Sequence, residues 1–465
     1  MSRTVIHGGL VITASDEIHA DVLIEGGRVA ALAAQGTDVG AGWSADRRID
    51  ATGKYVIPGG VDGHTHMEMP FGGTMSSDTF ETGTRAAAWG GTTTIVDFAI
   101  QSKGGSLREG LDKWHEKADG TCAVDYGFHM IMSDVNDSSL KQMDRLIEAG
   151  VTSFKLFTAY PGVFYSDDGQ ILRAMQRAGT NGGLVMMHAE NGIAIDVLVE
   201  QALARGERDP RHHGEVRKAL LEAEATHRVI RLSQVAGSPV YVVHVSAQEA
   251  LAELTRARDE GLPVFGETCP QYLFLSTDNL AEPDFEGAKY VCSTPLRPEE
   301  HQAALWRGLR TNDLQVVSTD HCPFCFKGQK DMGIGDFSKI PNGMPGVEHR
   351  MDLLHQAVVD GHIARRRWIE IACAAPARMF GLYPRKGTIA PGADADIVVY
   401  DPHAEQVLSA GTHHMNVDYS AYEGKRITGR VETVLSRGVP VIEGGTYVGR
   451  AGHGAYVPRG LCQYL

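Results

Sequence analysis

The sequence has few cysteines, no long apolar run and no excess of positive charge. Its seven cysteines are spread over 465 residues, which predicts free thiols in a reducing compartment rather than a disulfide framework. Lys and Arg number 44 against 58 Asp and Glu, a net charge of -14, and this balance excludes binding to nucleic acid or anionic membrane through a basic surface. No apolar run approaches the roughly 18 residues that span a bilayer, and the first residues lack the pattern of a signal peptide. We therefore expect a cytoplasmic globular protein.

Short β-strands are expected at both ends of the chain. Residues 1–57 (for example "TVIHGGLVITA" and "ADVLIEGGRVAALA") alternate apolar and polar residues and are interrupted by Gly-Gly turns, a pattern typical of β-hairpins. The same pattern returns in residues 385–450, for example in "RVETVLSRGVPVIEGG". We predict one small β-sandwich domain built from these two segments. The tail, residues 451–465, is expected either to form an arm that contacts another subunit or to be disordered.

The middle of the chain, residues 58–384, alternates apolar runs with helical segments. Runs that are apolar throughout predict strands with both faces covered, as in a parallel sheet wrapped by helices. Eight such strands predict an α/β fold, a (β/α)8 TIM-like barrel, with a doubly wound open sheet as the alternative. The eight runs are "YVIPGGVDGHTH", "TTTIVDFAI", "VDYGFHMIM", "TSFKLFTAY", "GLVMMHAE", "PVYVVHVS", "PVFGETCP" and "LQVVSTDH".

Side chains that can bind a metal fall at the carboxyl ends of five of these runs. In a barrel the carboxyl ends of all strands meet on one face, where the active site lies, so distance along the chain does not separate these groups. Single members prove little, because 20 histidines give roughly one His-x-His pair by chance, and a lone histidine is more often a hydrogen-bonded core residue. Together they predict a metal centre. The candidate ligands are His64, His66, Lys155, His188, His244 and Asp320.

The lysine within the apolar run "SFKLFTAYPG" needs its own explanation. Burying an unpaired ammonium is costly, so Lys155 either reaches water along an exposed face or is chemically altered. Two divalent metals explain the altered form, because reaction of the amine with carbon dioxide makes an anionic carbamate that can bridge both ions. His64 and His66 alternate on an extended segment and so point the same way. Imidazole and carboxylate ligands favour Zn²⁺, with Mn²⁺ or Co²⁺ as substitutes.

Eight stretches of the chain carry a resemblance to a known family: "GGVDGHTHMEMPFGG", "GTTTIVDF", "FKLFTAYPG", "MMHAENG", "YVVHVS", "ETCPQYL", "STDHCPF" and "IPNGMPGVE". In this order they resemble the hydantoinase/dihydropyrimidinase family of the amidohydrolase superfamily, up to about residue 450. The resemblance implies a metal pair bridged by carboxylated Lys155. No ligand position is missing, which counts against the non-catalytic relatives, the collapsin response mediator proteins. The implied ligands are, for one ion, His64, His66 and Asp320 and, for the other, His188 and His244.

The same resemblance implies roles for further residues. Asp320 is expected to act as general base and then as general acid, and Tyr160 to stabilise the developing oxyanion. Backbone groups of Ser293 and Asn342 are expected to hold the imide edge of the ring; "CSTP" departs here from the more usual "CSPP", a change that a backbone contact should tolerate. Four apolar residues are expected either to line the pocket for the ring substituent or simply to pack: Met69, Phe71, Phe157 and Phe164.

The implied reaction opens 5,6-dihydropyrimidines or 5-substituted hydantoins to N-carbamoyl amino acids. Alternatives are an allantoinase, a dihydroorotase, or a non-catalytic scaffold of the same fold. Relatives are commonly tetramers, so a homo-oligomer, specifically a homotetramer, is expected. We discount Cys322-x-x-Cys325 as a zinc knuckle because no second pair lies at suitable spacing, and we assign "RHH" at 211–213 to a surface loop or subunit contact.

Overall fold

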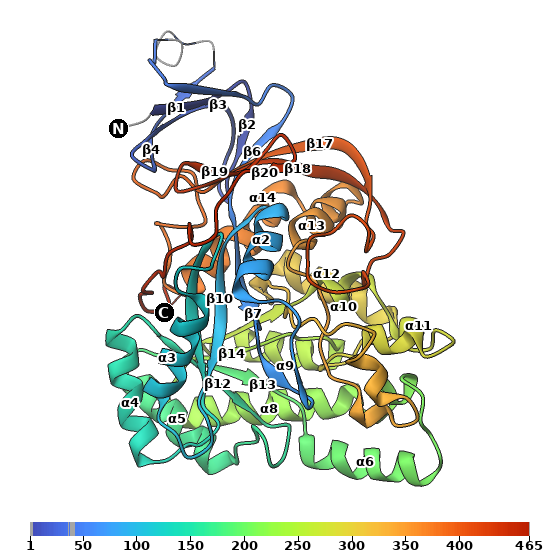
Figure 1. The fold of residues 1–465 in the computed structure, drawn as a ribbon. Helices are drawn as coiled ribbons and strands as arrows, with labels where there is room; N and C mark the ends of the chain where they lie inside the picture. The colour runs from blue at the N-terminus through green and yellow to red at the C-terminus, as the bar shows by residue number, and fades with distance from the viewer. Residues whose placement is uncertain (1–2, 36, 38–41, 465) are drawn as a thin grey trace.

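The computed structural model describes residues 3–35, 37 and 42–464 (Figure 1). Eight parallel strands form one sheet in the order β16-β15-β14-β13-β12-β11-β10-β7. A parallel bridge between Thr65 and His321 links its two edges, so the sheet is nearly closed. The predicted (β/α)8 barrel is confirmed, and the open doubly wound sheet is wrong. The strands are β7 (Gly60–Thr65), β10 (Thr92–Ile100), β11 (Asp125–Ile131), β12 (Ser153–Phe157), β13 (Leu184–His188), β14 (Val240–Val242), β15 (Val264–Thr268) and β16 (Val316–Val317).

Helices cover the outside of this barrel and explain why its strands are apolar throughout. All five residues of β12 are buried, since one side faces the barrel interior and the other faces helices. Side-chain caps start several of the helices: the Ser106 hydroxyl accepts from the amide of Glu109, whose carboxylate accepts in return from the Ser106 amide. The helices are α2 (Phe80–Trp89), α3 (Leu107–Ala118), α4 (Asp137–Glu148), α5 (Asp168–Asn181), α6 (Gly192–Ala204), α7 (Arg211–Val216), α8 (Ala219–Ala236), α9 (Gln248–Asp259), α10 (Pro270–Phe274), α11 (Thr277–Leu280), α12 (Glu300–Thr311), α13 (Arg350–Val359), α14 (Arg365–Ile369) and α15 (Ala375–Met379), with single turns η1 (Glu286–Tyr290), η2 (Lys330–Gly333), η3 (Phe337–Lys339) and η4 (Glu370–Ala374).

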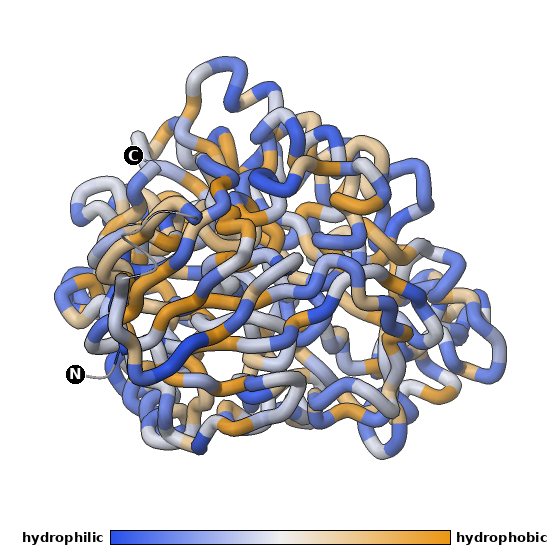
Figure 2. Tube along the Cα trace, turned by 90° about the horizontal axis from the view of Figure 1, so that it is seen from above, coloured by the Kyte–Doolittle hydropathy of each residue, from blue (hydrophilic) through white to orange (hydrophobic). Residues whose placement is uncertain are grey.

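A second, ten-stranded sheet joins both ends of the chain, as the sequence predicted. Strand β6 pairs antiparallel with β17, so that Ile57 faces Val398 across more than 300 positions of sequence. The run "YVIPGGVDGHTH" is therefore divided at Gly59 between this sheet and the barrel. Seen from above, apolar stretches follow neighbouring strands while polar stretches gather in the outer loops (Figure 2). The strands are β1 (Arg3–His7), β2 (Leu10–Ile12), β3 (Glu17–Glu25), β4 (Arg28–Ala34), β5 (Arg47–Asp50), β6 (Tyr55–Pro58), β17 (Ile397–Val407), β18 (Arg426–Ser436), β19 (Val439–Glu443) and β20 (Thr446–Tyr447).

The tail packs against the chain's own barrel, so the expectation of disorder is wrong for residues 451–464; Leu465 lies outside the described residues. The Val457 amide donates to the Tyr126 carbonyl at 2.7 Å, and the buried Arg459 guanidinium donates to the Phe128 carbonyl at 2.6 Å. Because Tyr126 lies near the start of β11, the tail covers the amino end of the barrel. None of the helices in the described ranges combines the length and apolar character that crossing a membrane requires.

Candidate metal centre

The predicted ligands meet at the carboxyl end of the barrel, as strand topology requires. Five of them (His66, Lys155, His188, His244 and Asp320) line one small cavity of about 40 Å³. The sixth, His64, is fully buried and contacts two of these five residues. Its Nε2 atom lies 2.9 Å from Lys155 Nζ and 3.1 Å from Asp320 Oδ1. The structure thus brings all six side chains together.

His64, His66 and Asp320 form the tightest group. One ligand atom from each lies within 4.8 Å of the others, and His66 Nε2 is 3.2 Å from Asp320 Oδ1. Burial alone would raise the pKa of Asp320, but the charge and hydrogen bond of His64 outweigh it and hold the pKa well below its usual range. Asp320 is therefore a carboxylate, the form that binds a metal ion.

Two buried carboxylates orient the imidazoles from behind. Glu267 Oε1 is hydrogen-bonded to Nδ1 of His64, and Glu190 Oε2 lies 2.8 Å from Nε2 of His188. Histidines that bind metals almost always donate their second ring N–H to such a group, so these contacts leave His64 Nε2 and His188 Nδ1 available for a metal. Neither glutamate was among the site residues predicted from the sequence. Glu190 could have been found, because it lies two residues after His188.

Lys155 is not on an exposed face. Only 2% of the residue is accessible, and Nζ lies 4.3 Å from the centroid of the Phe98 ring. Within the described ranges no carboxylate oxygen lies within 4.0 Å of it, whereas Lys386 has three such partners. Burial lowers the pKa of Lys155 to about 8, which increases the share of neutral amine, the form that reacts with carbon dioxide. The surroundings of Lys155 thus fit a lysine whose amine reacts with carbon dioxide.

The backbone holds several site residues in left-handed conformations. Tyr160, His244 and Asp320 have φ values of 62°, 41° and 51°. Such conformations are unfavourable for residues with a Cβ and persist where surrounding structure fixes them, often at functional sites. They point these side chains into the cavity from the ends of β12, β14 and β16.

Tyr160 presents a protonated hydroxyl to the cavity. Burial raises the pKa of Tyr160 to about 12, against the opposing charge of Arg217 and hydrogen bonds with Ser293 and Asn342. The phenol therefore remains a hydrogen-bond donor at any ordinary assay pH. Asn342 Nδ2 in turn donates to Ser293 Oγ at 3.0 Å, so the two predicted ring-holding segments are tied to each other.

Aromatic side chains form the apolar wall of the cavity. The Phe71 and Tyr160 rings meet edge to face with centroids 5.3 Å apart, and Phe157 stacks on Phe164 at 5.0 Å. Phe71 lies on a small hairpin, β8 (Pro70–Phe71) and β9 (Thr74–Met75). All seven predicted substrate-binding residues line this cavity: Met69, Phe71, Phe157, Tyr160, Phe164, Ser293 and Asn342. The cavity also includes Cys322 and Gly343, which the sequence analysis did not assign to it.

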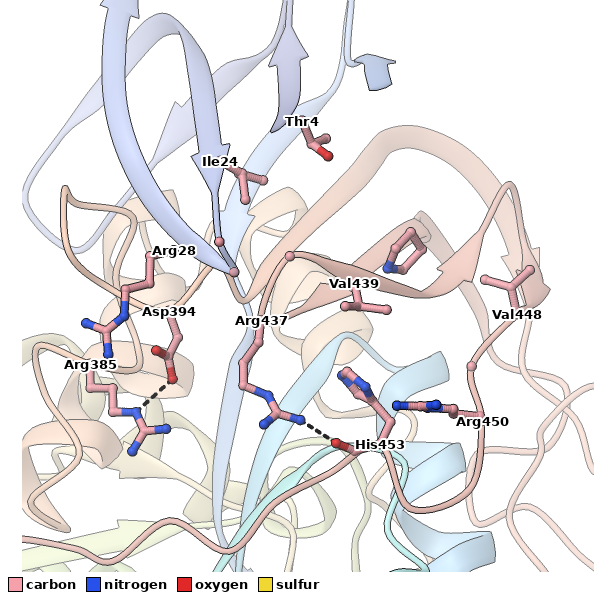
Figure 3. Close-up of a pocket in the computed structure, with 15 residues that line it drawn as sticks. Thr4, Ile24, Arg28, Arg385, Asp394, Arg437, Val439, Val448, Arg450 and His453 are labelled. Carbon is pink, nitrogen blue, oxygen red and sulfur yellow. Dashed lines mark hydrogen bonds and ion pairs between the residues drawn. The ribbon is translucent and has the colours of Figure 1, made fainter. Parts of the chain in front are cut away.

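A much larger hollow, of about 780 Å³, is lined by residues of the amino-terminal segment 4–28 and of the carboxyl-terminal segment 385–453. Four arginines reach it from different segments: Arg28, Arg385, Arg437 and Arg450 (Figure 3). Its lining carboxylate, Asp394, is already bonded to Arg385 at 2.8 Å. None of the predicted ligands lines this hollow, so the metal chemistry belongs to the smaller cavity.

The prediction that "RHH" at 211–213 forms a surface loop is wrong for its two histidines, whereas Arg211 is exposed. His212 and His213 are buried, and Nε2 of His213 bonds to the Cys292 carbonyl at 2.8 Å. Helix α7 therefore lies against the loop that carries Ser293. The polar composition "RHHGE" suggested exposure, and only the tertiary fold shows that the histidines face inward.

Imidazoles and a carboxylate gathered at the strand ends of a (β/α)8 barrel define a metal-dependent enzyme. The model of the Amidohydrolase family matches residues 55–441. A D-hydantoinase from Streptomyces coelicolor is 85% identical over 464 residues, covering 100% of this chain and 99% of the relative. A D-hydantoinase from Geobacillus stearothermophilus is 49% identical, with 98% and 96% covered. The crystal structure of dihydropyrimidinase from Brevibacillus agri NCHU1002 is 48% identical, covers 99% of both chains and gives a TM-score of 0.96.

The chain therefore belongs to the hydantoinase/dihydropyrimidinase family of the amidohydrolase superfamily. The predicted family is confirmed, and with it the prediction of a hydrolase.

Proposed function

We propose that this chain hydrolyses the cyclic amide bond of 5-substituted hydantoins and 5,6-dihydropyrimidines to N-carbamoyl amino acids. The observation that carries this proposal is the joint lining of one cavity by metal-binding side chains, Tyr160, Ser293 and Asn342. The 85% identity to a D-hydantoinase supports a D-selective hydantoinase in particular. An L-hydantoinase from Arthrobacter aurescens is only 28% identical.

Two divalent metal ions are proposed as cofactors, Zn²⁺ first and Mn²⁺ or Co²⁺ as substitutes. Bound metals of this kind polarise a carbonyl and lower the pKa of a water toward about 7. Carboxylation of Lys155 would give the shared anionic ligand, and the imidazoles bonded to Glu267 and Glu190 are already oriented to bind. The remaining ligands would be His64, His66 and Asp320 for one ion and His188 and His244 for the other.

The chain's own residues would then carry the reaction. Asp320 takes the proton of the attacking water and transfers it to the ring nitrogen that leaves, so the proton released by attack is used in cleavage. Tyr160 donates a hydrogen bond to the oxygen that becomes negative when the ring carbonyl is attacked. Backbone groups of Ser293 and Asn342 hold the imide edge, which fixes the carbonyl relative to Asp320.

The cavity wall favours neutral rings with an apolar substituent. Phe71, Phe157 and Phe164 provide apolar contacts, and of the described residues that line the cavity only Lys155 is a lysine or arginine. A dihydroorotase would need a cation to pair with the carboxylate of its substrate, and Lys155 lies among the metal ligands. This argues against dihydroorotate.

A homotetramer in the cytoplasm completes the proposal. Ile193 and Val197 on helix α6 are 55% and 49% exposed, and apolar side chains at the surface favour burial against another subunit. Light scattering coupled to size exclusion measures the subunit number directly.

A substrate panel tests the function. The protein should be assayed with 5-phenylhydantoin, dihydrouracil, allantoin and dihydroorotate, with chiral analysis of the carbamoyl products. We expect turnover of the first two and a D product from the hydantoin. Preferred turnover of allantoin or dihydroorotate would contradict the proposal.

A further inference from the structure

Lys330 is a fully buried lysine that has no carboxylate partner among the described residues. It lies on the single turn η2, in the long segment after β16, outside the set of predicted metal ligands. Its Nζ donates two hydrogen bonds, to the carbonyl of Val291 at 2.8 Å and to that of Pro341 at 3.1 Å. Two backbone carbonyls from separate loops thus meet at one amine.

Both carbonyls belong to the segments that carry the proposed ring-holding residues. Val291 lies two residues before Ser293, and Pro341 immediately precedes Asn342. The Gly343 amide donates to the same Val291 carbonyl at 3.0 Å. The Lys330 amine therefore contacts both loop segments that carry the proposed ring-holding residues, Ser293 and Asn342.

The neighbouring Gln329 anchors the same turn to another segment of the cavity lining. Its Nε2 donates to Thr74 Oγ1 at 2.9 Å and to the Met75 carbonyl at 2.7 Å, both on the β8–β9 hairpin that carries Phe71. The backbone of Lys330 is itself held, because its amide donates to the Cys325 carbonyl at 3.0 Å. The amine is thus presented from a fixed point.

A buried lysine is a costly way to fill space. Burial lowers the pKa of Lys330 to about 7, since the surrounding protein disfavours the ammonium. Methionine would fill a similar volume without that cost, but it has no N–H to donate. A neutral amine has two N–H groups, which matches the two carbonyls.

We propose that Lys330 is a positioning residue that sets the distance between the Ser293 and Asn342 segments and so shapes the imide-binding side of the cavity. The inference rests on the proposed function, because it assigns the held edge to a ring imide. Lys330 does not contact the reacting carbonyl in this arrangement. Its loss should weaken substrate binding in the ground state and the transition state alike, which raises KM and leaves kcat nearly unchanged.

The test compares Lys330→Met with Lys327→Met, an exposed lysine in the same loop. Both variants and the wild type are assayed with 5-phenylhydantoin, and metal content is measured in each sample. We expect Lys330→Met to raise KM roughly tenfold or more with kcat within about threefold of wild type, at unchanged metal content. Lys327→Met should match the wild type in all three quantities.

Lys330→Gln provides a second variant, because its side-chain amide keeps two N–H donors on a shorter chain. If the KM of Lys330→Gln falls between those of the wild type and Lys330→Met, the result supports a positioning role. If Lys330→Met does not fold, a KM that is raised in Lys330→Gln but not in Lys327→Met supports the same role. An unchanged KM in Lys330→Met overturns the inference, as does an unchanged KM in Lys330→Gln if that is the variant that folds. A fall in kcat and metal content without a change in KM overturns it too. If the wild type itself fails to open the ring, the proposed function is what has failed.

Discussion

Replacing Tyr160 with phenylalanine removes one hydroxyl and leaves the aromatic wall in place. The ring of Tyr160 packs edge to face against Phe71 and near His188, with centroids 5.3 and 5.4 Å away. A phenylalanine ring keeps both ring contacts and fills the same space except for the missing hydroxyl. Because burial raises the pKa of Tyr160 to about 12, the atom removed is a hydrogen-bond donor at neutral pH.

The expected effect is on the turnover number. Loss of one donor to a developing oxyanion costs about 3 kcal/mol in the transition state, which corresponds to a fall in kcat of roughly 100- to 1000-fold. The bond forms fully only as charge develops, so KM should change much less than kcat. The assay is initial-rate ring opening of 5-phenylhydantoin, with metals quantified in the same samples.

Tyr165→Phe is the matched control, since Tyr165 lies in the same loop but does not line the cavity. It should keep wild-type kcat. Loss of metal in parallel with activity in Tyr160→Phe would refute the oxyanion role and make Tyr160 a structural residue. A kcat within a few-fold of wild type would refute it equally.

The remaining predictions concern the ligands and the buried charges. Lys155→Ala should lose metal and activity together and recover part of both with short carboxylic acids; full activity would contradict the bridging carbamate. Glu267→Gln keeps the shape of the side chain but weakens the hold on His64, so affinity for metal measured by chelator competition should fall about 10- to 100-fold; unchanged affinity would contradict an orienting role. Burial lowers the pKa of Lys330 from 10.5 to about 7 in the folded protein, whereas the unfolded chain keeps the higher pKa. Between these two pH values the unfolded chain therefore binds more protons than the folded protein. The free energy of unfolding should accordingly rise with pH above 7, by up to about 1.4 kcal/mol per pH unit from this group, and urea unfolding of Lys330→Met should lack this increment; identical pH dependence would contradict it.

The barrel could be predicted because its signals are local. Each strand is a short apolar run, and topology alone brings the strand ends together, so His64 and Asp320 could be paired across 256 positions without any contact information. Lys155 was informative because a charged residue inside an apolar run conflicts with its surroundings.

The supporting residues could not be predicted because their role depends on partners distant in sequence. Glu267 is one acidic residue among 58 until the fold places it against His64. His213 occurs in a polar stretch whose composition suggests the surface, yet it contacts the loop of Ser293. Lys330 lies in a segment with no strand or helix periodicity, so nothing in its neighbours indicates burial.

The most direct test of the central claim is ring opening of 5-phenylhydantoin by protein whose metal content is varied by chelation and readdition. The account predicts that turnover rises with bound metal and reaches its maximum at about two ions per chain, with an N-carbamoyl D-amino acid as product. Full activity after removal of the metals, or no turnover with both ions bound, would contradict it.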